Sequence, residues 1–160
     1  MAFPLHPETP QEGRSLEDLF AGRGLDIPQM ITRLKRTADD LGLPFGTRTR
    51  TYNSRRAQEL GKWAETQGSG EVFHKSVFQA YFARGRNIAR MAVLKELAAG
   101  VGLNPDQAEQ ALNQGRYADD VDRDWERSRR MGITAVPTFV CNGRGLVGAQ
   151  PYEALKELVQ

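Results

Sequence analysis

The chain changes from a helical to an extended pattern of apolar residues at one place, Pro137. Before it, apolar residues recur every three or four positions, and capping residues and glycines divide the pattern into roughly six or seven helices. After it, residues 138–141 (TFVC) predict a strand, 142–145 (NGRG) a turn with two glycines able to take positive φ, and 146–147 the return strand. Pro151 then starts a last helix. The pattern predicts a mostly helical α/β fold.

Capping residues place the starts of most of these helices. The predicted caps are Ser15, Asp26, Asn53 with Ser54, Asn87 and Asn104. The helix capped by Asp26 carries one apolar stripe, which consists of Ile27, Ile31, Leu34, Ala38 and Leu41. The helix that ends before Gly85 has the widest apolar face, and it is expected to shelter the core of the helical part. That face consists of Phe73, Val77, Phe78, Tyr81 and Phe82.

The predicted sheet is too small to be complete. A two-stranded hairpin is marginally stable by itself, and the only other candidate strand is residues 2–5, at the start of the chain. Either another subunit completes the sheet, or the chain lacks part of the usual beginning of its fold.

Composition excludes several classes of protein. The 160 residues are 39% hydrophobic and 26% charged, which fits one globular domain. A net charge of +2 does not indicate a nucleic-acid partner. No apolar run approaches the roughly 20 residues of a membrane span, and the N-terminus lacks a signal-peptide pattern. One cysteine forms no internal disulfide, so we expect a cytoplasmic protein without a membrane partner.

Residues with catalytic or metal-binding chemistry are few. Cys141 shares a strand face with Phe139 and is expected to be a buried core residue. His6 and His74 have no further ligands at metal-binding spacing, so no metal site is expected. A basic segment contains Arg48, Arg50, Arg55 and Arg56 around Tyr52 and is interpreted as a solvated helix start.

Six segments, taken in their order and spacing, resemble the DsbA-like proteins with a thioredoxin fold, in the FrnE and 2-hydroxychromene-2-carboxylate isomerase branch. They are residues 3–13 (FPLHPETPQEG), 53–65 (NSRRAQELGKWAE), 77–89 (VFQAYFARGRNIA), 97–104 (LAAGVGLN), 132–143 (GITAVPTFVCNG) and 147–155 (VGAQPYEAL). The resemblance implies a single domain over residues 1–160, with a helical insertion at about 16–131 and a thioredoxin-like hairpin and helix at about 133–160.

The resemblance gives a meaning to the proline at the head of the strand. The local sequence alone leaves open whether Val136–Pro137 is cis or an ordinary trans strand start. In the family this proline is cis, and the backbone before it pairs with an extended substrate. The substrate-binding residues implied here are therefore Val136 and Pro137. Asn53, Ser54 and Arg55 match a segment near the ligand groove of the isomerases and kappa-class glutathione transferases.

The resemblance also implies that the family's first strand, its nucleophile motif and its first helix have no counterpart here. No catalytic residue can be assigned to a position of this chain, and no cofactor is expected. The resulting expectation is a truncated thiol–disulfide oxidoreductase homologue, inactive in dithiol exchange, that binds an extended peptide or a thiol substrate. Two alternatives stay open: an enzyme like the isomerases or kappa-class transferases, with glutathione as a possible cofactor, or a non-catalytic peptide-binding module. Unpaired sheet edges predict a homo-oligomer.

Overall fold

The computed structural model describes residues 1–160 and divides them into two compact units. Residues 6–121 form the first, here called the helical unit. Residues 1–5 and 122–160 form the second, here called the C-terminal unit. The fold is a mostly helical α/β fold with few short strands, as predicted. No helix is both long enough and apolar enough to cross a membrane.

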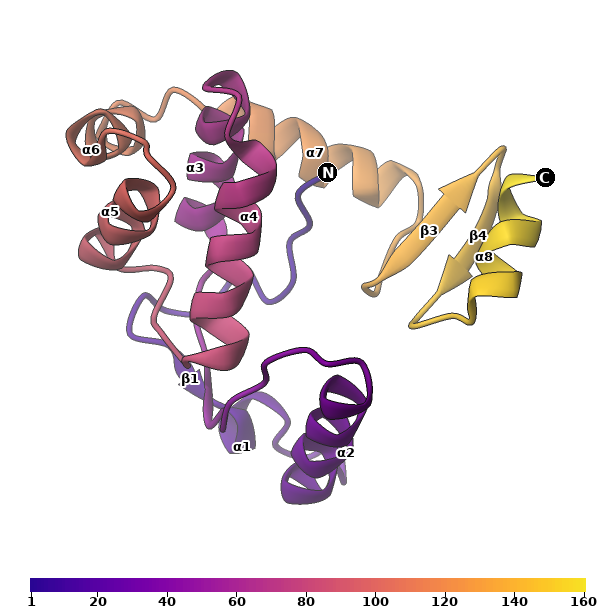
Figure 1. Ribbon diagram of the computed structural model, residues 1–160. Helices are drawn as coiled ribbons and strands as arrows, with labels where there is room; N and C mark the ends of the chain where they lie inside the picture. The colour runs from indigo at the N-terminus through magenta and orange to yellow at the C-terminus, as the bar shows by residue number, and fades with distance from the viewer. The chain divides into compact units, whose positions relative to one another are not determined.

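The helical unit contains two very short strands among its helices (Figure 1). Its elements are β1 (Arg14–Ser15), α1 (Leu16–Leu19), α2 (Ile27–Asp40), β2 (Arg50–Thr51), α3 (Arg55–Thr66), α4 (Gly70–Phe78), the π-helix η1 (Gln79–Ala83), α5 (Met91–Gly100) and α6 (Pro105–Asn113).

Most predicted helix starts are confirmed by their hydrogen bonds. The side chains of Ser15, Asp26 and Asn104 accept backbone N–H groups of the first turns of α1, α2 and α6. Asn87 is different, because its Oδ1 accepts the N–H of Ala89 in a turn that precedes the helix. As a result α5 begins only at Met91.

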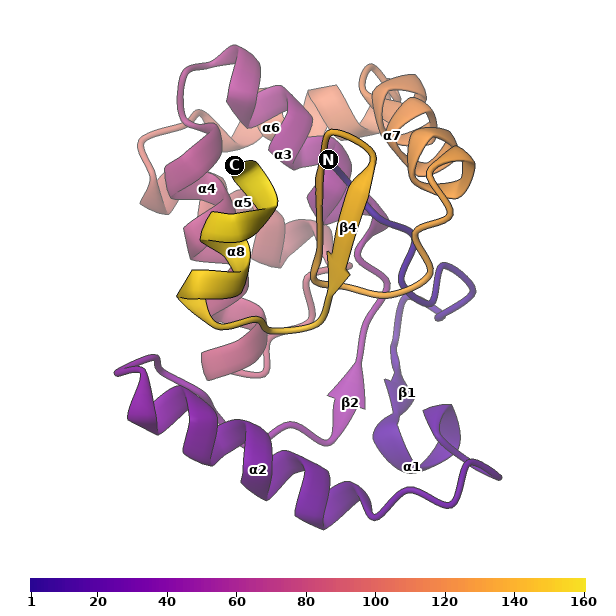
Figure 2. The same cartoon turned by 90° about the vertical axis from the view of Figure 1, so that its right-hand side faces the viewer.

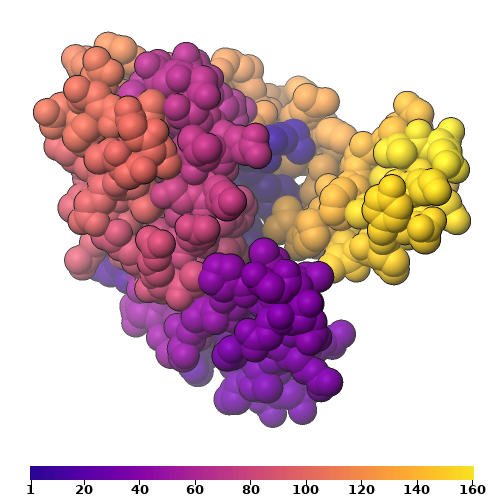
Figure 3. All heavy atoms as spheres, in the orientation of Figure 1, coloured from indigo at the N-terminus to yellow at the C-terminus, as the bar shows by residue number.

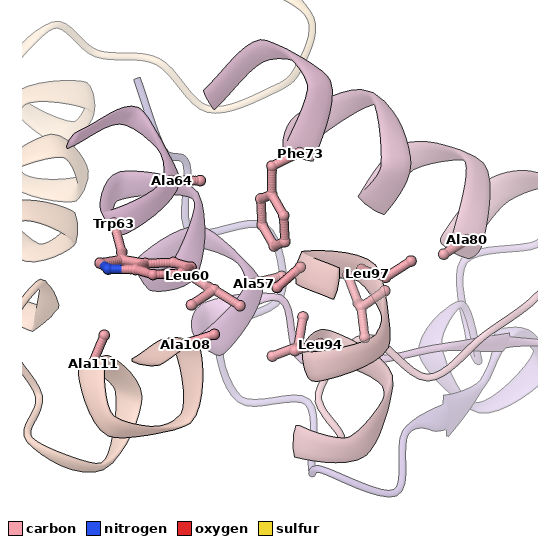
Figure 4. Close-up of a cluster of buried hydrophobic side chains, with 12 residues drawn as sticks. Ala57, Leu60, Trp63, Ala64, Phe73, Ala80, Leu94, Leu97, Ala108 and Ala111 are labelled. Atoms are coloured by element: carbon pink, nitrogen blue, oxygen red, sulfur yellow. The ribbon is translucent and has the colours of Figure 1, made fainter. Parts of the chain in front are cut away.

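The core of the helical unit lies between α3, α4, α5 and α6. Leu60, Phe73 and Leu94 are completely buried there. Figure 4 shows Phe73 pointing from α4 into the cluster that α3 and α5 complete. Alanines on α3 and α6 let these helices approach closely, with Trp63 between them. The unit therefore encloses its own apolar core.

The strands β1 and β2 form a small antiparallel sheet that the sequence pattern did not predict (Figure 2). Arg14 pairs with Thr51, and Ser15 pairs with Arg50. Two residues per strand are too few for an alternating pattern to be read from the sequence.

The apolar stripe predicted on α2 is buried over only part of its length. Ile27 and Ala38 are buried, whereas Leu34 and Leu41 are exposed. In the space-filling view α2 stands as a purple lobe at the edge of its unit (Figure 3). The amphipathic pattern predicted that this segment is a helix, but it did not show which residues would pack against its apolar face.

Phe78 does not shelter the core, which corrects the role predicted for it. It lies five residues after the buried Phe73, so it points about 140° away from it around an α-helix of 3.6 residues per turn. Its side chain is 59% exposed and stacks on Phe82 with ring centroids 5.9 Å apart.

The C-terminal unit is a hairpin with one helix beside it. After α7 (Ala118–Arg130), which begins in the helical unit, come β3 (Thr138–Cys141), β4 (Arg144–Val147) and α8 (Tyr152–Val159). Asn142 and Gly143, both at positive φ, form the two-residue turn. Gly145 belongs to β4 rather than to the turn, which corrects the predicted extent of the turn.

Residues 2–5 do not form the strand that was considered for them. They run beside α7, where the backbone N–H of Ala2 donates to Oδ2 of Asp124 at 2.7 Å. The only sheet partner of β3 is β4.

The two faces of this hairpin differ. Phe139 lies opposite Leu146, and Cys141 opposite Arg144, so these four side chains share one face. Arg144 reaches α8 through the carbonyl of Glu157, which places α8 over that face. The opposite face carries Val140 and Val147, 43% and 59% exposed. Cys141 is partly exposed, not buried as predicted, because a two-stranded sheet has an open edge on each side.

Candidate functional site

The segment between α7 and β3 holds the first group of predicted site residues. The Val136–Pro137 peptide bond is cis, as the family resemblance implied. Two hydrogen bonds fix the chain on either side of Val136. Thr138 Oγ1 donates to the carbonyl of Ala135 at 2.6 Å, and the N–H of Gly148 donates to the carbonyl of Pro137 at 2.8 Å.

Between these two anchors the backbone of Val136 is unpaired. Neither its N–H nor its C=O takes part in a hydrogen bond, and the residue is 46% exposed. It stands two residues before the start of β3. A free donor and acceptor on one exposed residue, held at the head of a strand, are what an added extended chain needs for pairing.

The second group, at the start of α3, is bonded within its own unit. Asn53 Nδ2 donates to the carbonyls of Pro7 and Thr9 at 3.0 and 2.8 Å, and its Oδ1 accepts the N–H of Arg55 at 2.9 Å. Asn53 therefore accepts the N–H of the first residue of α3, although the N-cap position itself is Ser54, and it also ties residues 7–9 to the helix. Ser54 makes no side-chain cap but accepts from Gln58 Nε2 at 3.0 Å.

Arg55 is also held by intrachain bonds. Its Nε pairs with Glu59 Oε1 at 2.5 Å, and its Nη2 donates to the carbonyl of Ala118 at 2.9 Å. The structure thus assigns positioning contacts to all three residues predicted to bind a ligand here. Asn53, Ser54 and Arg55 belong to the helical unit, and Val136 and Pro137 to the C-terminal unit.

The basic segment before α3 is also bonded, which differs from the solvated helix start expected for it. The guanidinium of Arg48 lies over the ring of Tyr81, 4.5 Å from its centroid, and its Nη2 donates to the Tyr81 hydroxyl at 2.7 Å. Arg50 donates to the carbonyl of Gly13 at 3.0 Å. Arg50 and Arg56 are both exposed, and Arg56 is the one arginine of this segment whose side chain makes no hydrogen bond or ion pair.

The network around Tyr81 was not predicted as a unit. Thr51 Oγ1 lies 2.9 Å from the same hydroxyl, and Phe82 meets the Tyr81 ring edge-on at 4.8 Å. Tyr81 and Phe82 belong to η1, a π-helix, and such turns are rare and concentrate at functional sites. The partners are 30 or more residues apart in sequence, so no local pattern could reveal them.

The remaining titratable candidates are isolated. Cys141 is the one cysteine, and it is free. His6 has its Nδ1 3.8 Å from a Glu8 carboxylate oxygen, and His74 has its Nε2 3.5 Å from Glu65. No group of three or more histidine, cysteine or acidic side chains is arranged to hold a metal ion.

Known proteins are similar to this chain in structure or in sequence. A probable DsbA oxidoreductase of Streptomyces coelicolor superposes with a TM-score of 0.84 at 28% identity, over 94% of this chain and 68% of that structure. The uncharacterized protein YwbO of Bacillus subtilis is 29% identical over 98 residues, 61% of this chain. The chain spans about half the length of this curated relative, since the match covers 49% of it.

The family model for the DSBA-like thioredoxin domain matches residues 1–160, which is the entire chain. The chain belongs to the DSBA-like thioredoxin domain family.

Proposed function

We propose that this chain binds an extended peptide by adding it as a strand at Val136, and that it carries out no dithiol exchange. The observation behind the binding proposal is the unpaired backbone N–H and C=O of Val136, a residue that is 46% exposed and is flanked by hydrogen bonds on both sides. Main-chain pairing of this kind gives affinity without requiring a particular peptide sequence. A thiol peptide such as glutathione is a shorter ligand of the same class.

The proposal that the chain carries out no dithiol exchange rests on the number of electrons that disulfide reduction needs. Reduction of a protein disulfide takes two electrons, which a dithiol supplies as it closes its own disulfide. Cys141 has no second cysteine with which to close one. A single cysteine also fits the reducing environment of the cytoplasm, which the proposal takes as the place of action.

Backbone methylation of a peptide tests strand addition without altering the protein. Overlapping fluorescein-labelled peptides from the reduced and alkylated insulin B chain serve as probes, with fluorescence anisotropy as the readout. In antiparallel pairing one peptide residue exchanges both hydrogen bonds with Val136, while the N–H groups of its neighbours point away. N-methylation of that one residue should abolish binding, and methylation of either neighbour should leave it unchanged. Equal loss at all three positions would rule out strand addition.

An insulin-reduction assay with dithiothreitol tests the proposed lack of dithiol exchange. The chain should not accelerate insulin precipitation above dithiothreitol alone, and Cys141→Ala should behave in the same way. A clear acceleration that disappears in Cys141→Ala would contradict the proposal.

A further inference from the structure

A groove runs between α4 with its π-helical continuation η1 on one side and α5 on the other, two elements that lie side by side (Figure 1). Its volume is about 420 Å³, within the range of small-molecule sites. All of its lining residues belong to the helical unit, so it is separate from the segment around Val136.

Leu97 and Val101 form an apolar part of the groove lining, here called the floor. Leu97, 4% exposed, belongs to the buried cluster of the unit, and Val101 packs against that cluster. Val72 stands half-exposed on the α4 wall. These side chains can cover a short hydrocarbon chain and remove it from water.

The rim of the groove is cationic. Lys75, Arg84 and Arg86 line it together with one carboxylate, Glu96. Arg86 Nη2 pairs with Glu96 Oε2 at 2.5 Å, so this cation is already compensated. Lys75 and Arg84 make no ion pair and no side-chain hydrogen bond. The groove therefore has two positive charges without an acidic partner.

From this combination we propose that the groove binds a small carboxylate with a short apolar tail. The carboxylate lies between Lys75 and Arg84, where charge-assisted hydrogen bonds from both side chains replace its hydration. The tail lies over Leu97 and Val101. Ser76 and Gln79, on the same wall, offer further polar contacts at the groove.

The competing explanation is that the two cations serve only the helix ends. Lys75 lies in the last turn of α4, and Arg84 directly follows η1, where positive side chains are favoured by the helix dipole. That explanation predicts no saturable ligand binding, so a titration separates the two.

Sodium hexanoate is the probe, titrated into the full chain with ¹H–¹⁵N NMR as the readout. Saturable shifts should appear at the amides of Ser76, Gln79 and Val101. Hexan-1-ol and inorganic phosphate, which supply the tail or the anion alone, should each bind at least about tenfold more weakly, a loss of 1.4 kcal/mol. Phosphate binding as tight as that of hexanoate would overturn the part played by the apolar floor. An absence of saturation with hexanoate would overturn the site.

Two charge-removing variants and one control locate the anion. Arg84→Gln and Lys75→Gln should each weaken hexanoate binding by about tenfold. Arg33→Gln removes an exposed and unpaired cation from α2 and should leave binding unchanged. An equal loss in Arg33→Gln would show that general positive charge, and not the groove, attracts the probe. Val72→Ser, at an exposed position on the groove wall, removes no charge and therefore tests whether the apolar lining contributes to hexanoate binding.

Discussion

The two units of the chain differ in how they cover their apolar residues. The helical unit surrounds Leu60, Phe73 and Leu94 completely with its own helices. The hairpin of the C-terminal unit is covered by α8 on one face and leaves Val140 and Val147 at the surface of the other. The apolar residues of the two units are of similar kinds. Composition therefore does not explain why one unit buries them while the other leaves some at its surface.

Backbone hydrogen bonding explains it. A helix pairs its backbone groups internally and needs only side-chain contacts to bury its apolar face. A strand pairs with its neighbours, and a two-stranded sheet keeps two open edges and needs cover on both faces. The comparison shows that the helical unit covers its own apolar core, whereas the hairpin leaves one face and both edges uncovered.

The sharpest contrast is expected for truncation of a side chain in each unit. Leu60→Ala, in the completely buried core, should lower the free energy of unfolding by about 2–5 kcal/mol. The matched change Val147→Ala, on the open face, should stay within about 0.5 kcal/mol of the wild type when the chain is dilute enough to be monomeric. Urea unfolding followed by circular dichroism at such dilution measures both. A loss for Val147→Ala as large as that for Leu60→Ala in the monomer would show that the chain itself covers this face.

Asn53→Ala should have the next largest effect. It removes three hydrogen bonds, two to residues 7–9 and one to the first turn of α3, and leaves their partners unpaired. We expect a loss of about 1–3 kcal/mol in the free energy of unfolding. Arg56→Ala, an exposed neighbour, is the control and should be close to neutral. If Asn53→Ala instead kept its stability and lost ligand affinity, the substrate-binding role predicted for Asn53 would be supported.

We also propose that the open face and edges of the hairpin pair with a second copy of the chain. Sedimentation velocity at micromolar concentration should then show a homo-oligomer. Val147→Lys places a charge on the open face and should weaken self-association by about tenfold or more. Tyr152→Lys, at a residue that is exposed on α8, is the control. A wild-type chain that sediments as a single monomer would contradict the proposal.

The smallest effect concerns Lys95, which links α5 to α6. Its Nζ lies 2.5 Å from Glu109 Oε2 and 3.0 Å from Asp106 Oδ1, and the hydrogen bonds that it donates to these two carboxylates raise the pKa of Lys95. A raised pKa means that the folded state holds this proton more tightly than the unfolded state. The stabilisation is therefore complete below the unfolded pKa of about 10.4 and is lost as the pH rises through the folded pKa.

Lys95→Met isolates this contribution. The difference in unfolding free energy between wild type and Lys95→Met should shrink as the pH rises above about 10. A difference that stays constant across this range would show that the ion pairs do not contribute to stability in solution.

Local patterns predicted what depends on neighbouring residues. The caps Ser15, Asp26 and Asn104 lie at the helix starts expected from the sequence, and the hairpin begins at Thr138 as expected. These features depend on interactions within a few residues, which a sequence window contains. The cis bond before Pro137 needed the resemblance to the family, because the local sequence allowed both isomers.

Features that depend on distant contacts were missed. The exposure of Leu34 and Leu41 follows from what packs against α2, which the stripe itself does not reveal. The contact of Arg48 with Tyr81 joins residues 33 positions apart. For Asn53 the sequence did not reveal the hydrogen bonds to Pro7 and Thr9, because these partners come from a distant loop.

Residue-resolved hydrogen exchange of the native chain, followed by NMR, tests the contrast between the units most directly. The amides of Leu60 and Leu94 should exchange slowly, at rates set by global unfolding of the helical unit. The amide of Val136 should exchange at nearly the rate of an unstructured chain, and it should become protected when the bound peptide is added. A Val136 amide that is as protected as that of Leu94 without peptide would contradict the account, because its backbone would then already be paired.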